Sequence, residues 1–180
     1  MRIHGITTIA TTMVAFALAG GIAFAAQDRF ALKVPDGLAF ADFKGYETWQ
    51  DVASSETETA VKAILANPIM IKAFKEGIPG NGKPFPEGSK IVKIEWVKKK
   101  NPVSPYFVEI PDQLKNVDLI EKDSKRFAAT QGWAYAQFGY DVPSDSFKPS
   151  AASSSGHECG FACHSIAKTH DYIFTAYPKR

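Results

Sequence analysis

Two cysteines and a histidine close to the C-terminus constrain this chain more than any other feature. The segment Cys159-Gly160-Phe161-Ala162-Cys163-His164 contains both cysteines of the 180-residue sequence. Paired thiols followed directly by a histidine are typical of covalent haem attachment, in which the thiols add to the two haem vinyl groups and the histidine faces the iron. The usual spacing is C-x-x-C-H, whereas three residues separate the cysteines here. The longer spacing leaves two other roles for the cysteines open.

The same residues are compatible with a disulfide or with a zinc site. A Cys159–Cys163 disulfide accounts for the pair in an exported protein, but it gives no role to the adjacent His164. Zinc has four candidate ligands in His157, Cys159, Cys163 and His164. These ligands would crowd a tetrahedral site, because structural zinc sites usually draw on two separated pairs. The haem interpretation is favoured because it uses both thiols and the histidine.

The N-terminus has the pattern of a secretory signal peptide. Arg2 precedes a largely apolar run from Ile6 to Leu18, and Ala23-Phe24-Ala25 fits the small-x-small cleavage pattern. We therefore expect residues 1–25 to be a signal peptide and residues 26–180 to form a single domain, located in the periplasm or otherwise exported. An uncleaved membrane anchor is the alternative for this segment. No later stretch is long and apolar enough to span a bilayer.

Composition argues against two broad classes of protein. The formal net charge is +2, and Arg2 is the one charged residue that leaves with the signal peptide, so strong binding to nucleic acid is not expected. Aromatic residues make up 12% of the chain and recur along it, which is atypical of a disordered protein. The length after cleavage is enough for one ordinary hydrophobic core.

Hydrophobic periodicity predicts an α+β fold, with an antiparallel β-sheet and flanking helices. A short helix is expected from Tyr46 to about Val52. Two further helices are expected on either side of Asn67-Pro68, the second ending at Gly77. A charged turn is expected at 98–102 and a flexible segment at 145–156. The expected strands are Lys90–Val97, Tyr106–Ile110, Val117–Lys122 and Trp133–Tyr140.

Several segments, taken in order, resemble the cytochrome P-460 family, which includes the related cytochromes c′-beta. They are Gly45 to Trp49, Pro84 to Gly88 with the following strand to Trp96, Lys122 to Trp133, and Cys159 to His164 with Asp171 to Thr175. Together they span nearly all of the chain after the signal peptide. The resemblance implies a small exported c-type haem protein, built mostly of antiparallel sheet and usually dimeric.

The resemblance also implies how one haem c would be held. Cys159 and Cys163 would attach it covalently, and His164 would bind the iron as the proximal ligand of a five-coordinate haem. If the two cysteines share a helical turn, residues at i and i+4 lie on one face, so both sulfurs can still point at one porphyrin edge.

The sixth position of the iron is expected to be open. Met70 is the one methionine outside the signal peptide, and its place on an apolar helix face predicts core packing. His157 and His170 lie too close to His164 in sequence to reach the opposite haem face easily. An open iron binds small molecules such as nitric oxide, oxygen or hydroxylamine.

One lysine divides the family, according to the resemblance. In the P-460 type a lysine is bonded to the porphyrin rim and hydroxylamine is oxidised. In the c′-beta type that bond is absent, and phenylalanines line a gas-binding pocket. Lys93 best matches the family lysine, and on a strand it shares a face with Ile91 and Glu95. An ordinary solvated lysine is the alternative.

Other candidate residues have weaker signals. Glu95 is a candidate proton acceptor beside the haem, and Arg126 a candidate partner of a haem propionate. A surface carboxylate and a pairing with a nearby acid are the respective alternatives. The candidate pocket aromatics, most of them expected to be core, are Phe40, Phe43, Phe74, Phe85 and Phe107.

The sequence thus predicts an exported mono-haem c-type cytochrome that oxidises hydroxylamine, alone or with nitric oxide, and passes electrons to a partner cytochrome. The expected partners are a small nitrogenous ligand, that cytochrome and a second copy of the chain. One alternative is a protein that binds nitric oxide without catalysis. The other is an exported binding domain without haem, with the Cys159–Cys163 disulfide.

Overall fold

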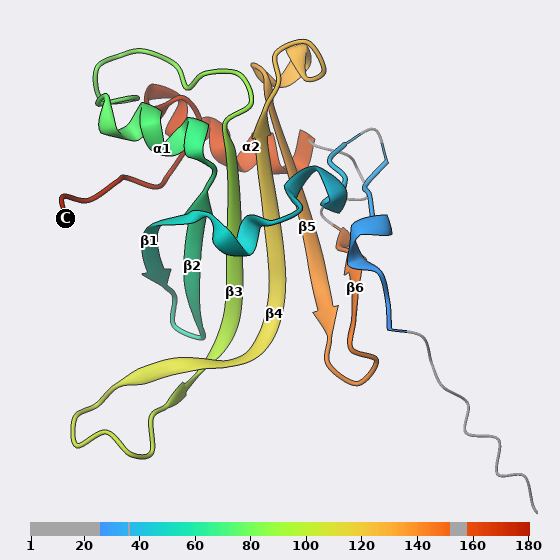
Figure 1. Ribbon diagram of the computed structural model, residues 1–180, viewed down its shortest axis with the longest axis vertical. Helices are drawn as coiled ribbons and strands as arrows, with labels where there is room; N and C mark the ends of the chain where they lie inside the picture. Colours follow the sequence, from blue (N-terminus) through green and yellow to red (C-terminus); the bar gives the residue numbers. More distant parts are fainter. Residues whose placement is uncertain (1–25, 36, 152–157) are drawn as a thin grey trace, which may run out of the picture.

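One antiparallel sheet organises the molecule. The computed structural model describes residues 26–35, 37–151 and 158–180, so the predicted signal peptide at 1–25 lies outside the described residues. The six strands follow one another in chain order, β1 to β6, and each pairs antiparallel with the next (Figure 1). Their bounds are β1 Gln50–Glu56, β2 Ala60–Ala66, β3 Lys90–Lys100, β4 Glu109–Lys122, β5 Trp133–Asp141 and β6 Ser146–Pro149. The α+β prediction with an antiparallel sheet is confirmed.

Short helices complete the fold. The α-helices are α1, Pro68–Lys75, and α2, Glu158–His164, and the latter contains both cysteines. Single turns of 3₁₀-helix occur at Arg29–Ala31, Phe40–Phe43, Tyr46–Thr48 and Ala128–Thr130, and a longer 3₁₀ segment, kinked at Ala167, spans Ser165–His170. Within the described part of the chain, no helix is long and apolar enough to cross a membrane.

Alternation along the central strands gives the sheet two buried faces. On β3, neighbouring Ile91 and Val92 are both buried and belong to different hydrophobic clusters. On β5, Trp133 and Tyr135 belong to one cluster and Ala134 and Phe138 to the other. Side chains of successive strand residues point to opposite faces, so two covering layers are needed.

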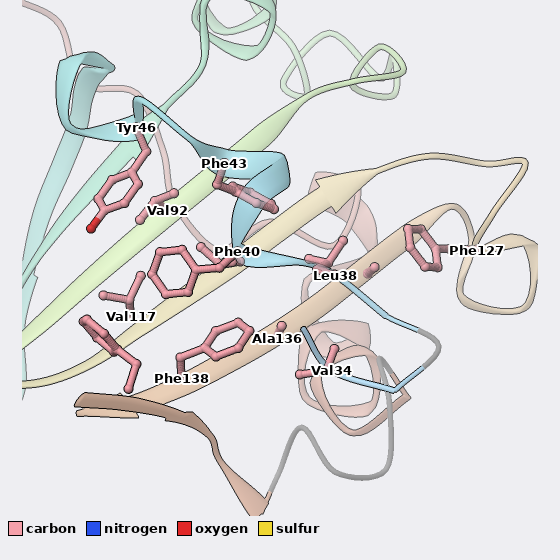
Figure 2. Close-up of a cluster of buried hydrophobic side chains, with 13 residues drawn as sticks. Val34, Leu38, Phe40, Phe43, Tyr46, Val92, Val117, Phe127, Ala136 and Phe138 are labelled. Carbon is pink, nitrogen blue, oxygen red and sulfur yellow. The ribbon is translucent and has the colours of Figure 1, made fainter. Parts of the chain in front are cut away.

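The segment before β1 covers one face. In Figure 1 this segment, coloured blue to cyan, lies across the near side of the sheet. Phe40 and Phe43 are fully buried there, and the Phe40 ring lies 5.0 Å from that of Phe138 on β5. Figure 2 shows these aromatic rings meeting Val92 and Val117 of the sheet. Apart from the phenolic hydroxyl of Tyr46, the buried side chains of this cluster are apolar.

The opposite face is covered by α1, α2 and the C-terminal segment. Met70 and Phe74 of α1 pack on this face, and so do Phe85 of the loop before β3 and Ile173 of the C-terminal segment. Met70 is fully buried, as expected for a core residue. This face also carries the candidate site.

Asn67 ties α1 to β3. Its side-chain Oδ1 accepts hydrogen bonds from the backbone N–H of Met70 (3.1 Å) and of Lys90 (3.2 Å), and its Nδ2 donates to the Gly88 carbonyl (2.8 Å). Pro68 follows at the first helical position, where its missing N–H costs nothing. Asn67 is therefore the N-cap of α1 and a bridge to the loop before β3.

We expect Asn67→Ala to lower the free energy of unfolding by about 2 kcal/mol, the upper end for loss of an N-cap, because two further bonds to β3 and its loop are lost. Urea denaturation measures the change. Asp28→Ala is the control, because Asp28 is exposed and caps a single turn through Phe30 N–H (3.0 Å). It is expected to cost about 0.5 kcal/mol. Equal losses in the two variants would contradict the bridging role.

Three of the predicted elements were wrong. The helix expected from Tyr46 to Val52 is a single tight turn followed by β1, and the helix expected before Asn67 is β2. Strand β2 pairs on both sides, with β1 and β3. It buries Ala60, Ile64 and Ala66 on one face, and the half-buried Leu65 packs against the cluster on the other face, so the apolar side chains on both faces give a spacing that resembles that of a helix. The lysines 98–100, expected in a turn, instead extend β3. The side chains of Lys98 and Lys99 form ion pairs with Glu109 and Asp112 of the neighbouring strand β4.

Other boundaries also differ. The two strands expected near Tyr106–Ile110 and Val117–Lys122 are one long strand, β4, whose partner β3 pairs with it along most of its length. Tyr106 and Phe107 precede it and are exposed. The short strand β6 lies inside the segment expected to be flexible. The expected strands at 90–97 and 133–140 and the helix after Asn67 are confirmed.

Candidate functional site

A cavity of about 600 Å³ lies on the face of the sheet that α2 covers. Its floor comes from β2 to β5, and its walls come from α2, β1 and the C-terminal segment 173–176. The volume lies within the usual range of about 300–1,000 Å³ for ligand and cofactor pockets. Cys159, Cys163, His164 and Lys93 all line this one cavity. Four of the sequence candidates therefore meet in one place.

Helix α2 presents both thiols to the cavity. Cys159 and Cys163 are four residues apart on this helix, and both are free and exposed. Residues at i and i+4 share a helix face. The predicted helical placement of the two cysteines is confirmed, so the extra residue between them does not turn one sulfur away from the cavity.

Gly160 allows α2 to approach the sheet closely. A Cβ built on Gly160 would lie 2.2 Å from the Cβ and 2.6 Å from the Cγ of Tyr135 on β5. Such distances are far below van der Waals contact, and the Cβ of Tyr135 cannot move independently of the strand. The residue after the first cysteine therefore has to be glycine for α2 to sit where it does.

His164 is held in one tautomer. Its Nδ1 lies 2.6 Å from the carbonyl oxygen of Tyr172, which can only accept, so Nδ1–H is the donor. Nε2 is then left with a free lone pair, as in metal-binding histidines whose other nitrogen donates to a carbonyl. The imidazole lies between the rings of Tyr135 (4.4 Å) and Phe174 (4.7 Å), which restrict its rotation.

The electrostatic surroundings keep His164 neutral. Burial lowers the pKa of its imidazole, the hydrogen bond to the Tyr172 carbonyl acts in the opposite direction, and the Lys93 ammonium adds to the lowering. A neutral imidazole is the form that binds a metal ion. Tyr135 beside it is also neutral, because burial raises the pKa of its phenol.

The residues around the cavity fit a covalently bound haem. Two free thiols on one helix face and one neutral imidazole with an available Nε2 are the donors that such a group needs. The floor beside them is largely apolar, through Ile64, Ile91 and Ile120. Among the described residues the two cysteines are free thiols, and no three metal-ligating side chains gather; His157, the fourth candidate zinc ligand, lies outside them.

A polar row crosses the cavity floor beside the apolar one. Lys93, Asp118 and Gln137 are cross-strand neighbours on β3, β4 and β5, and all three line the cavity. The Lys93 Nζ lies 3.0 Å from Asp118 Oδ2, and Gln137 Nε2 donates to Asp118 Oδ1 at 2.8 Å. Asn116 Nδ2 donates to Asp118 Oδ2, also at 2.8 Å. Asp118 is thus a well-fixed carboxylate paired with the candidate lysine.

Glu95 lies at the edge of this row and does not itself line the cavity. It is buried, and its carboxylate contacts Lys115 Nζ (2.6 Å) and Lys62 Nζ (3.8 Å). Lys62 does line the cavity. A role for Glu95 in proton transfer therefore has to pass through Lys62 and stays a prediction.

Arg126 lies away from the cavity lining. Its guanidinium is 3.5 Å from the Glu121 carboxylate and 3.3 Å from the Gly37 carbonyl, and it lies over the Phe127 ring. This is the pairing with a nearby acid that the sequence left as the alternative to a propionate contact. We do not include Arg126 in the site.

The candidate phenylalanines lie elsewhere. Phe40, Phe43, Phe74 and Phe85 are core residues, and Phe107 is exposed on the loop before β4. The aromatic residues of the cavity are Tyr135 and Phe174 instead.

The sequence did not indicate a role for Asp118, Gly160 or Asp171. The role of Asp171 is described below. Asp118 alternates with the buried Val117 and Leu119 in a predicted strand, so its face could have been inferred. Its pairing with Lys93 could not, because that depends on the register between β3 and β4.

Comparison with known proteins agrees with this geometry. No curated protein matches the chain. The family model for cytochrome P-460 matches residues 43–175, from the turn before β1 through the whole sheet and α2 to the wall of the cavity. Because this match covers most of the sequence, the chain belongs to the cytochrome P-460 family of haem proteins.

Proposed function

We propose that this protein is an exported mono-haem c-type cytochrome that oxidises hydroxylamine and passes the electrons to a partner cytochrome. The observation that carries the proposal is that Lys93 lines the same cavity as Cys159, Cys163 and His164. In the family, the P-460 type is the one in which a lysine is bonded to the porphyrin. When bound, the haem would supply an iron that takes the substrate nitrogen at its open position and accepts electrons from it.

The residues of the chain have distinct roles in this proposal. Cys159 and Cys163 would hold the haem by thioether bonds, and His164 Nε2 would be the axial ligand. Lys93 would bind the porphyrin rim and tune its electronics. The Lys93 ammonium has to lose a proton before its nitrogen can form a bond, and Asp118 at 3.0 Å is the adjacent acceptor. The new bond replaces a C–H bond of the porphyrin rim and an N–H bond of the amine, so both hydrogens would leave as protons and two electrons would pass to an external two-electron oxidant such as a peroxide.

The stoichiometry also calls for proton acceptors at the cavity. Oxidation of hydroxylamine to nitric oxide releases three protons and three electrons. The electrons would go to the partner cytochrome. The protons would leave through the polar row, with Asp118 first and the Lys62–Glu95 pair next to it.

Peptide mapping of the purified holoprotein by mass spectrometry tests the proposal directly. We expect a haem-bearing fragment joined to Lys93 as well as to Cys159 and Cys163. We expect Lys93→Arg to keep the charge and the Asp118 pair, lose the porphyrin bond and its red-shifted absorption, and oxidise hydroxylamine about 100-fold more slowly or worse, the usual scale for losing one group that tunes the reacting atoms. Reduction of an added cytochrome measures the rate.

Lys62→Arg is the matched control. Lys62 also lines the cavity and is paired with a carboxylate, but it stands on β2, outside the segments by which the sequence resembles the family. This variant is expected to keep the porphyrin bond and its red-shifted absorption, so it controls for the spectrum, while a fall in its activity reports the proton path through Lys62 and Glu95. An unmodified Lys93 in fully matured holoprotein would remove the enzymatic proposal.

A second candidate function is binding of nitric oxide without catalysis. The observation that favours it is the ion pair between Lys93 and Asp118, in which the lysine nitrogen lies 3.0 Å from the carboxylate. The side-chain amides of Asn116 and Gln137 hold this carboxylate in place. A lysine that stays in this pair does not bond to the porphyrin. An ordinary c-type spectrum together with tight nitric oxide binding by the reduced protein would establish this function instead.

The proposal includes two further properties. We expect cleavage after Ala25 during export, which N-terminal sequencing of the mature protein checks. We also expect a homodimer, which sedimentation equilibrium checks.

A further inference from the structure

A buried ion pair lies behind the candidate haem site. The Asp171 carboxylate contacts Lys122 Nζ at the end of β4, with its two oxygens at 2.9 and 3.0 Å. It also accepts from Phe85 N–H (2.7 Å) and from Trp133 Nε1–H (3.3 Å). The side chains of Lys122 and Asp171 are only 7% and 12% exposed, so this is an internal contact. One carboxylate thus joins the C-terminal segment to β4, β5 and the loop before β3.

The backbone around Asp171 makes a turn that the chain does not favour by itself. Asp171 and Tyr172 have φ values of 49° and 64°, so two successive residues other than glycine adopt the left-handed conformation. Residues with side chains rarely adopt it, and strained backbone persists only where the surroundings hold it. The local bonds, from Asp171 N–H to the Lys168 carbonyl and from Tyr172 N–H to the Ala167 carbonyl, close the turn without connecting it to the sheet.

This turn aims the Tyr172 carbonyl at His164. The carbonyl oxygen accepts the 2.6 Å hydrogen bond from Nδ1. After the turn, Ile173 is buried on the sheet and Phe174 packs against the imidazole. The turn therefore sets the tautomer and, through Phe174, contributes to the orientation of the ring, together with Tyr135, whose hydroxyl also donates to the Tyr172 carbonyl at 3.5 Å.

We propose that Asp171 is a positioning residue for the axial ligand: it fastens the Asp171–Tyr172 turn to the sheet and so holds the Tyr172 carbonyl against His164 Nδ1. The inference rests on the proposed role of His164 as the iron ligand. A strong Nδ1–H hydrogen bond makes the imidazole a better electron donor, which stabilises the ferric state of a bound haem. Asp171 thereby sets the reduction potential without contacting the haem ligand itself.

The test is Asp171→Asn in the holoprotein. An asparagine has one acceptor oxygen in place of two, and its NH₂ group faces the Lys122 ammonium, so the turn loses its main anchor. We expect the iron–histidine stretching band in the resonance Raman spectrum to move to lower frequency. We expect the ferrous-to-ferric ratio at a fixed potential to rise about tenfold, equivalent to about +59 mV for one electron.

Glu121→Gln is the matched control. Glu121 is the buried neighbour of Lys122 on β4, and it pairs with Lys90 (3.1 Å) and Arg126 (3.5 Å), away from the His164 turn. Its loss is expected to lower stability but to leave the Raman band and the potential unchanged. If the Asp171→Asn holoprotein does not accumulate, Lys122→Gln weakens the same anchor from the other side and is expected to move both readouts in the same direction.

The outcomes separate this inference from the proposed function. A Raman band that is unaffected by His164→Ala shows that His164 is not the axial ligand, which overturns both. A band that depends on His164 but is the same in wild type, Asp171→Asn and Lys122→Gln overturns the positioning role alone. Equal shifts in Glu121→Gln and Asp171→Asn would also overturn it, because they would reflect general loosening of the fold.

Discussion

Gly160→Ala is expected to displace α2 from the sheet and to prevent normal haem attachment. The added Cβ would lie 2.2 Å from the Tyr135 Cβ, an atom fixed to the backbone of a strand that pairs on both sides. Relief therefore has to come from α2, which carries Cys159, Cys163 and His164. We expect a loss of about 3 kcal/mol in the free energy of unfolding, the upper end for overpacking, and a large fall in haem per protein. Urea denaturation measures the change in stability, and the ratio of haem absorbance to protein absorbance measures the haem content.

Gly139→Ala is the control for this prediction. Gly139 stands on the same strand as Tyr135, and a Cβ there meets nothing within 4 Å. The variant is expected to change stability by no more than about 0.5 kcal/mol and to bind haem normally. If Gly160→Ala behaves like Gly139→Ala, the close approach of α2 is not what places the cysteines.

Short-range patterns in the sequence predicted the local geometry of two elements that meet at the cavity. The strand alternation that placed Lys93 on a face with Ile91 is confirmed, since both line the cavity. The i, i+4 relation of Cys159 and Cys163 on a helix is confirmed as well. Both inferences depend on geometry within a few residues, which the sequence determines directly. The family resemblance supplied what these patterns lacked, namely that the strand and the helix belong to one site.

Long-range relations were beyond the sequence. The pairing of Lys93 with Asp118 requires the register of β3 on β4, and a shift by one residue would put Asp118 on the other face. Strand β2 was predicted as a helix because the half-buried face also carries apolar side chains, Val61 and Leu65, so the sequence does not alternate between apolar and polar residues. Arg126 was assigned without knowledge of Glu121, its partner in the fold. In each case a tertiary contact decided the outcome.

The Asp171 network shows the same limit most clearly. Its carboxylate joins residues that are 38 to 86 positions away in the sequence. Nothing in the local sequence around Asp171 indicates that its partner is Lys122, a buried lysine at the end of β4. The segment from Asp171 to Thr175 was recognised through the family resemblance. The structure adds a physical reason for two of its residue types: Asp171 supplies the carboxylate that anchors the turn, and Ile173 supplies an apolar side chain that enters the core.

Lys122→Met is expected to be among the most destabilising single changes in this protein. Lys122 is buried, lies 4.9 Å from the centre of the Trp133 ring and is the one cation among the described residues that is paired with Asp171. Methionine fills a similar volume, but it leaves the Asp171 carboxylate buried with only two N–H donors. Breaking a buried ion pair from one side costs about 3–5 kcal/mol, because the remaining charge has lost its counter-ion and is largely shielded from water.

Two comparisons make this prediction specific. Lys72→Met removes the lysine of an exposed pair with Glu76 (3.9 Å) and is expected to cost no more than about 0.5 kcal/mol in urea denaturation. The double variant Lys122→Met with Asp171→Asn removes both buried charges and is expected to recover part of the loss, since the penalty comes from the unpaired carboxylate and not from the missing amine. If the double variant is less stable than Lys122→Met, the carboxylate tolerates isolation and the ion pair does not hold the turn beneath His164.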